Sequence, residues 1–138
     1  MRKLIGTLLT AAAISGCAGS YESAMENRFF DTDKAPPASG LVGVWTGGFS
    51  MGVITLKIDA DGGGLSCSSM GSNNSIYQLK HNAGRLYFQA GSHVTLQQQG
   101  DGLIAVYPPM MGTQTEIKML RDPNLDNASP YCQENMRR

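Results

Sequence analysis

The chain of 138 residues has few aromatic residues, few histidines and no excess of charge of either sign. It contains one Trp, four Phe and five Tyr, and its 11 Lys and Arg residues balance 11 Asp and Glu residues. Binding to a nucleic-acid backbone depends on clustered Lys and Arg, so we expect no nucleic-acid partner. The low aromatic content and 17 Gly predict one small domain with many turns and argue against a helical bundle.

Residue sets typical of metal sites and hydrolases are also missing. His81 and His93 each stand in or beside a predicted turn, without a second His, a Cys or an acidic cluster nearby in the sequence. The serines between positions 66 and 69 are not part of a GxSxG motif. Asp59-Ala60-Asp61-Gly62 begins like a calcium loop, but Met70 stands where the bidentate acid is needed, so a hairpin turn is predicted instead. We expect no cofactor, no metal and no enzymatic activity; an enzyme of unrecognised type is the minor alternative.

The N-terminus carries an apolar run that is too short to span a bilayer. Residues 1–16 combine a positive start, the apolar segment Leu4–Ile14 and two small residues, which predicts an export signal. Ile14-Ser15-Gly16-Cys17 resembles the lipobox of bacterial lipoproteins. The resemblance implies cleavage before Cys17 and acylation of Cys17 by diacylglycerol and a further fatty acid such as palmitate. An ordinary secreted protein with an incidental Cys17 is the alternative.

The expected location follows from this anchor. Two or more acyl chains hold a protein firmly in a membrane, since each buried CH₂ contributes about 0.8 kcal/mol. By similarity to Gram-negative lipoproteins, Ala18 after Cys17 implies sorting to the outer membrane with the domain facing the periplasm. In a Gram-positive source the anchor would lie in the cell membrane.

Two cysteines remain once Cys17 is acylated. Cys67 and Cys132 lie 65 positions apart, and an even pair in an oxidising compartment forms a disulfide by default. On the chain-entropy model, closing such a loop stabilises a fold by about 4 kcal/mol. A redox or nucleophilic thiol is the alternative, but it would need a CxxC motif or a placed His, and neither is present.

Composition divides the mature chain into a tether and a domain. Residues 17–40 mix Ser, Gly and charged residues, show no sustained apolar period and end in a Pro-rich stretch, which predicts a flexible lipidated tether. Phe29 and Phe30 within it either pack back on the domain or sit at the lipid interface. Residues 41–138 are expected to form the folded domain, with a C-terminal tail that Cys132 ties back.

Short runs of β-branched and aromatic residues separated by Gly, Asn and Asp predict an all-β domain. Eight strands are expected, at Leu41–Phe49, Val53–Ile58, Gly64–Ser69, Ile76–Lys80, Arg85–Gln89, His93–Gln98, Leu103–Tyr107 and Thr113–Leu120. Most connections have the length of hairpin turns. An antiparallel up-and-down meander that closes into a small β-barrel is favoured over a sandwich, because closure removes the strand edges.

Gly43-Val44-Trp45 opens the first strand, and this GxW start before a meander resembles the lipocalin-like, or calycin, barrels. In that family an Arg after the last strand packs over the Trp and closes one end of the barrel. Arg121 stands at the equivalent place, so the resemblance implies a contact between Trp45 and Arg121. Such stacking contributes about 0.5 to 2 kcal/mol. A plain core Trp and a surface Arg are the alternative.

The expected barrel is much shorter than those of ligand-carrying lipocalins. An eight-stranded barrel is just wide enough for its own side chains or one small ligand, so a large apolar ligand is not expected. A carrier of a small apolar ligand would need an open lumen. The alternating residues that would line it are Ile54, Leu56, Val94 and Leu96.

A second resemblance concerns the membrane-bound lysozyme inhibitors, which are small lipid-anchored barrels with a disulfide and an SGxxY segment. Gly84 and Tyr87 match that segment, but Ala83 replaces its Ser, and the Lys-bearing segment that should follow is absent. The resemblance therefore covers size, compartment and architecture, and implies a binding role without a defined site.

The most apolar connection is the predicted loop formed by Tyr107, Pro108, Pro109, Met110 and Met111. Adaptable Met side chains on a loop stiffened by Pro suit the recognition of a partner. A lid over the barrel mouth is the favoured alternative. The sequence as a whole predicts a membrane-anchored lipoprotein that acts as a non-catalytic binding module for an unknown envelope protein. A lysozyme-inhibitor-like protein, a structural envelope component and a carrier of a small apolar ligand are the alternatives.

Overall fold

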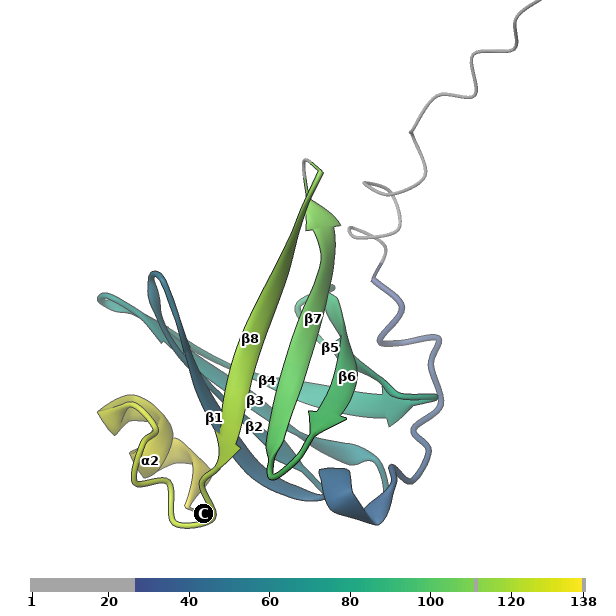
Figure 1. Ribbon diagram of the computed structural model, residues 1–138, viewed down its shortest axis with the longest axis horizontal. Helices are drawn as coiled ribbons and strands as arrows, with labels where there is room; N and C mark the ends of the chain where they lie inside the picture. Colours follow the sequence, from purple (N-terminus) through teal and green to yellow (C-terminus); the bar gives the residue numbers. More distant parts are fainter. Residues whose placement is uncertain (1–26, 111, 138) are drawn as a thin grey trace, which may run out of the picture.

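The computed structural model describes residues 27–110 and 112–137, which form an antiparallel β-barrel with a C-terminal helix (Figure 1). Its elements are η1 (Ser39–Leu41), β1 (Gly43–Phe49), β2 (Gly52–Ile58), β3 (Gly63–Met70), β4 (Asn73–Asn82), β5 (Arg85–Phe88), β6 (His93–Gln99), β7 (Gly102–Met110), β8 (Thr113–Arg121) and α2 (Pro130–Met136). The all-β class and the up-and-down order predicted from the sequence are confirmed.

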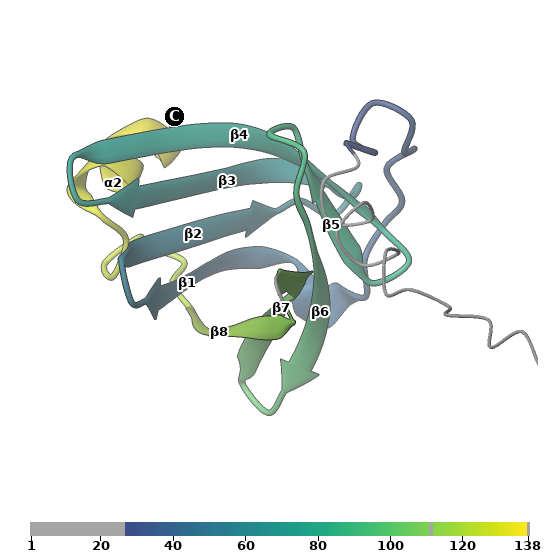
Figure 2. The same cartoon turned by 90° about the horizontal axis from the view of Figure 1, so that it is seen from above.

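Each strand pairs with the next, and β8 returns to β1, so the sheet closes on itself. The closing ladder is short: it contains the pairs Trp45↔Arg121 and Thr46↔Leu120. Figure 2 shows β1 to β4 side by side, with β6 to β8 crossing on the other side of the barrel. Closure therefore depends on one end of β1 and the last residues of β8.

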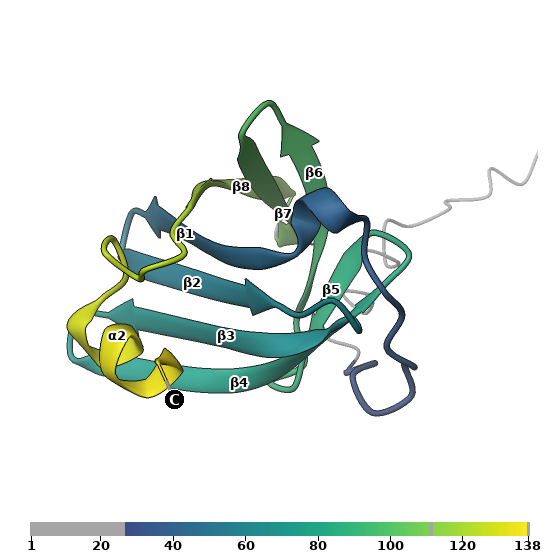
Figure 3. The ribbon, with the colours of Figure 1, turned by 90° about the horizontal axis from the view of Figure 1, so that it is seen from below.

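Two apolar clusters lie on opposite faces of the β1–β4 part of the sheet. The inner cluster fills the barrel with Leu41, Trp45, Ile54, Leu56, Ile58, Leu79, Leu86, Phe88, Val94, Leu103, Ala105, Ile117 and Met119. The outer cluster joins Cys67 of β3 to the C-terminal segment, in which Leu125, Ala128, Cys132 and Met136 are buried. In Figure 3, α2 lies across β3 and β4, and the segment before it crosses β1 and β2. Some outward side chains of these strands, among them Thr46, Thr55 and Cys67, are therefore buried as well.

Trp45 closes one end of the barrel. Its side chain is fully buried, and Nε1 donates a hydrogen bond of 3.0 Å to the carbonyl of Leu41, the last residue of η1. The Arg121 guanidinium lies 4.3 Å from the centre of the Trp45 ring, so the predicted contact is present. Gly43 of the GxW segment has a φ of 130°, and a Cβ at that position would lie 3.2 Å from Nη1 of Arg121. The positive φ favours glycine at this position, and a larger residue would also press on the end of the Arg121 side chain.

The same guanidinium ties down the chain that enters β1. Its Nη1 and Nη2 groups donate hydrogen bonds of 3.2 and 2.6 Å to the carbonyls of Val42 and Gly40. Arg121 therefore covers the indole and also holds the backbone of the first strand.

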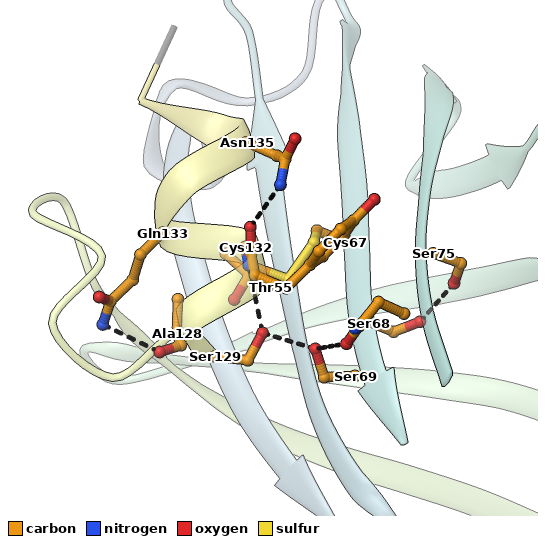
Figure 4. Close-up of a disulfide and its surroundings, with 12 residues drawn as sticks. Thr55, Cys67, Ser68, Ser69, Ser75, Ala128, Ser129, Cys132, Gln133 and Asn135 are labelled. Carbon is orange, nitrogen blue, oxygen red and sulfur yellow. Dashed lines mark hydrogen bonds between the residues drawn. A yellow bond between two sulfur atoms is a disulfide. The ribbon is translucent and has the colours of Figure 1, made fainter. Parts of the chain in front are cut away.

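The C-terminal segment is fixed by a disulfide and by a buried carboxylate. Cys67 and Cys132 form the predicted disulfide, with their Cα atoms 5.8 Å apart (Figure 4). Ser129 caps α2 by accepting a hydrogen bond of 3.2 Å from the amide of Cys132. Asp122, which is 3% exposed, accepts hydrogen bonds from Thr46 Oγ1 at 2.8 Å and from the Asn127 amide at 3.1 Å. The tail predicted to be tied back is thus a packed layer that contains a helix.

The structure corrects the predicted boundary of the tether, because residues 27–40 pack on the barrel. Phe29 is 5% exposed, and Lys80 of β4 donates hydrogen bonds of 2.9 and 3.0 Å to the carbonyls of Phe29 and Thr32. His81 fixes Ala35 through two hydrogen bonds of 2.8 Å. The ring Nδ1 of His81 binds the carbonyl of Ala35, and the amide of Ala35 donates to the carbonyl of His81. Composition indicated a tether because the contacts that hold this segment use backbone groups and one buried ring, and such contacts do not show in the composition. Residues 17–26 lie outside the described residues.

Some strands extend into segments that were predicted to be turns. β4 begins at Asn73 and ends at Asn82, and β7 continues through Pro108 and Pro109 to Met110, with a register shift between Tyr107 and Met110. The predicted loop at this point is therefore mostly strand. The prediction was wrong because Pro residues are tolerated in a strand where the sheet is irregular. Met111 lies outside the described residues.

The contact between Trp45 and Arg121 can be tested by a double-mutant cycle. Trp45→Ala should lower the free energy of unfolding by about 3 to 5 kcal/mol, because it removes a fully buried aromatic side chain. Arg121→Ala should cost less, and the double variant should be less damaged than the sum of the single variants by about 0.5 to 1 kcal/mol. Urea denaturation measures all three values. Strictly additive losses would show that the two side chains do not interact.

Candidate functional site

A pocket opens at the barrel end away from Trp45. It has a volume of about 430 Å³ and lies between the β1–β2, β3–β4 and β7–β8 hairpins. Its lining consists of Phe49, Met51, Ile54, Ser68, Met70, Tyr107, Pro108, Thr115 and Ile117. None of these side chains is charged, and most are apolar. The volume falls within the range of roughly 300 to 1,000 Å³ that is usual for small-molecule sites.

The pocket exists because β1 and β8 diverge beyond their short ladder. Gly47 still lies so close to β8 that an added Cβ would come within 2.5 Å of the Lys118 carbonyl oxygen. In the described residues, the segment Thr113–Ile117 of β8 pairs with β7 and has no strand partner on its β1 side. Figure 1 shows the β7–β8 hairpin rising away from β1. The pocket lies across this seam, with Phe49 of β1 on one side and Thr115 and Ile117 of β8 on the other.

The rim of the pocket carries exposed methionines. Met51, in the β1–β2 turn, is 69% exposed, and Met70, at the end of β3, is 38% exposed. Unbranched thioether side chains adapt to different apolar shapes. Their position at the tips of two hairpins makes the entrance apolar as well as the interior.

Hydroxyl groups provide the polar part of the lining. Ser68 and Ser75 on neighbouring strands are joined by a hydrogen bond of 2.8 Å between their Oγ atoms. The phenol of Tyr107 is neutral at physiological pH, and burial raises its pKa further, from 10.0 to about 12. The pocket thus offers neutral hydrogen-bonding groups beside an apolar surface, and it suits an uncharged, largely apolar group.

The predicted site residues are distributed between this pocket and the barrel core. Tyr107 and Pro108 line the pocket, whereas Pro109 lies in an adjoining recess beside Arg85 and His93. Met111 and Cys17 lie outside the described residues. Of the four residues expected to line an open lumen, Ile54 reaches the pocket, while Leu56 and Val94 are in the filled core and Leu96 packs against it. The lumen is therefore open at one end and filled at the other.

Sequence reasoning missed the residues that complete the pocket. Thr115 and Ile117 come from β8, and Phe49 and Met51 from the first hairpin. Alternation along Thr113–Met119 was available as a signal for inward-facing residues. The pattern could not indicate that the strand would separate from β1.

The described contacts of the two histidines belong to the fold and not to a metal or catalytic site. The ring of His81 is 5% exposed, and its Nε2 accepts a hydrogen bond of 3.2 Å from the Gly84 amide, so Nδ1 carries the proton donated to Ala35. Burial, and then the charges of Arg85 and Arg28, lower the pKa of His93. Among the described residues, no group of three His, Cys, Asp or Glu could hold a metal ion.

A second recess lies on the outer face of β2 to β4 beside the N-terminal segment. Lys34, Lys57 and Lys80 line it together with Asp59 and Asp61. Lys34 forms an ion pair with Asp61, and Lys80 is held by the backbone carbonyls described above. The mixed charges make this recess a less specific candidate than the uncharged pocket.

Comparisons with known proteins agree with the barrel and its family resemblance. A family model described as "Bacterial lipocalin LPS transport optimiser YedD" matches residues 26–136. The fold is similar to the crystal structure of a lipoprotein YedD from Klebsiella pneumoniae subsp. pneumoniae MGH 78578, with a TM-score of 0.56 and 17% sequence identity. That match covers 80% of this chain and 92% of the other. No match was found among curated protein sequences. In the part of the chain that the structure describes, no helix has the length and apolar character to cross a membrane.

Tyr107 gives the pocket a measurable pH dependence. Its pKa is about 12 in the folded protein against 10.0 ordinarily, so the folded state holds the neutral phenol and the unfolded chain ionises first. The stabilisation is complete below pH 10 and is lost as the pH rises through 12, by up to about 3 kcal/mol. The difference in unfolding free energy between wild type and Tyr107→Phe should therefore fall between pH 10 and 12 in urea titrations. A difference independent of pH would contradict the assignment.

Proposed function

Because the chain belongs to the YedD family of bacterial lipocalins, we propose that it is a non-catalytic binding module of the bacterial envelope. Its ligand is the acyl chain of a lipid, held in the pocket between the hairpins. The observation that carries this proposal is the uncharged, mainly apolar lining of that pocket. A hydrocarbon chain loses no hydrogen bonds on entering such a site and gains from the removal of its surface from water.

The family description connects its members with LPS transport. Lipopolysaccharide is held in membranes by acyl chains, and its sugar and phosphate groups are too polar for this pocket. Since the pocket is small and lies at the barrel end between the hairpins, it accommodates part of an acyl chain and leaves a large head group outside. We therefore infer that the chain assists LPS transport by transient contact with an acyl chain, without enclosing the whole molecule.

The proposal includes the lipid anchor. Family membership and the Ile14-Ser15-Gly16-Cys17 segment together support acylation of Cys17. A protein anchored in the outer membrane with its domain in the periplasm would stand where lipopolysaccharide arrives.

A protein partner is the second candidate, and the seam favours it. The β1 side of Thr113–Ile117 offers backbone groups to an added strand, and alternate side chains of that strand could enter the pocket. The envelope protein expected as a partner would then bind through an extended segment.

Pocket filling tests the ligand site. Thr115→Phe adds a ring to the lining and should weaken the binding of cis-parinaric acid, a fluorescent fatty acid, by about tenfold or more, which corresponds to about 1.4 kcal/mol. Glu116→Phe adds the same ring at the neighbouring exposed position, which does not line the pocket, and should leave the affinity unchanged. Fluorescence titration provides both values. Equal affinities for wild type and Thr115→Phe would refute acyl-chain binding at this site.

Removal of the acylated residue tests the anchor. Cys17→Ala should move the protein from the membrane fraction to the soluble fraction and abolish its labelling with a fatty acid, because the thioether and the new amino group both belong to that residue. Fractionation followed by immunoblotting measures the first effect. Unchanged membrane association together with unchanged lipid labelling would refute acylation at Cys17.

A further inference from the structure

Phe30 is an exposed aromatic residue held at a defined place on the barrel. It is 69% exposed, whereas Phe29 is 5% exposed, and their rings meet edge to face with centroids 5.3 Å apart. Lys80 lies 4.5 Å from the centre of the Phe29 ring and binds the Phe29 carbonyl. Phe30 therefore projects from a segment that Lys80 fixes through both the ring and the backbone carbonyl of Phe29. Single exposed apolar residues are common, so the position of Phe30 in the chain decides its meaning.

The distance to the proposed anchor is short. The described chain begins at Asn27, whose side-chain amide donates a hydrogen bond of 3.2 Å to the Gln89 carbonyl. Nine residues separate Cys17 from Asn27, and the ten steps between these two Cα atoms can span at most about 35 Å. A barrel anchored through Cys17 therefore keeps the face that bears Asn27 and Phe30 near the bilayer, where membrane contact becomes an intramolecular event.

The charges beside Phe30 indicate which part of a membrane it would meet. Within residues 27–34, the positive charges of Arg28 and Lys34 balance the negative charges of Asp31 and Asp33. In the recess beside Phe29, Lys57 and Lys80 are likewise balanced by Asp59 and Asp61. This balance gives no net attraction to anionic lipids. An aromatic ring without such attraction suits the uncharged interfacial region of a bilayer, where aromatic side chains are enriched.

We propose that Phe30 contacts the surface of the bilayer that holds Cys17 and thereby sets the orientation of the barrel. The inference rests on the acylation proposed above. The segment that carries Phe30 lies on the opposite side of the barrel from the tips of the β1–β2 and β3–β4 hairpins (Figures 1 and 2). Those tips bear Met51 and Met70 of the pocket rim. The contact would hold these tips away from the anchoring membrane, so that ligands reach the pocket from the periplasmic side.

Three equally exposed positions allow a matched test. Phe30, Met51 and Leu120 are 69%, 69% and 68% exposed and lie on different parts of the barrel. The chain has one native Trp, Trp45, which is fully buried and supplies a constant background. Phe30→Trp, Met51→Trp and Leu120→Trp are made in the full acylated protein and reconstituted in vesicles of phosphatidylethanolamine and brominated phosphatidylcholine.

Bromine quenching of the added Trp should be at least about twofold stronger for Phe30→Trp than for the other two variants, since interfacial aromatic rings lie at head-group level. The difference should persist at high salt, because the local charges cancel. Equal quenching at all three positions, or strongest quenching at Met51→Trp, would overturn this inference while leaving the anchor intact. Absence of every variant from the vesicle fraction would overturn the anchor and this inference together.

Discussion

The stacking of Arg121 on Trp45 is the contact on which the barrel depends. The ladder that closes the sheet has two residue pairs, which by themselves provide little to hold β1 and β8 together. The guanidinium lies 4.3 Å from the indole centre and also binds the carbonyls of Gly40 and Val42. Because one side chain covers the core and fixes the entry to β1, the barrel is closed at this end and needs no pairing at the other.

The open end is possible because the other strands are held from outside. The disulfide between Cys67 and Cys132 joins β3 to α2, and Asp122 binds Thr46 of β1 and the Asn127 amide. These links give β1 to β4 a buried outer face in addition to the barrel core. The paired half of the barrel therefore has support on both faces, and β8 can separate from β1 while the rest of the sheet keeps its shape.

The pocket arises from this asymmetry. A barrel of eight short strands has little interior space, and here most of that space is filled by the core around Trp45. The divergence of β1 and β8 adds room at this end of the sheet, where Phe49 of β1 and Ile117 of β8 both line the pocket. The pocket, the methionine rim and the seam are therefore consequences of how the barrel closes.

Local patterns in the sequence determined the strand order, the all-β class and the pairing of the two cysteines, because turn residues and alternation act over short stretches and the cysteines could be counted. The contact between Trp45 and Arg121 was implied by the resemblance of Gly43-Val44-Trp45 to the lipocalin-like barrels. Only the tertiary structure decided that residues 27–40 pack on the barrel, that Tyr107–Met110 continue β7, and that a helix covers β3 and β4. The packing of residues 27–40 and of the helix depends on contacts between residues far apart in the chain, such as Lys80 with Phe29 or Cys67 with Cys132, whereas the extension of β7 depends on its register shift against β8. The pocket also depends on distant residues. It exists where β1 and β8, the first and last strands of the barrel, stop pairing, and no local pattern in the sequence encodes the separation of these two strands.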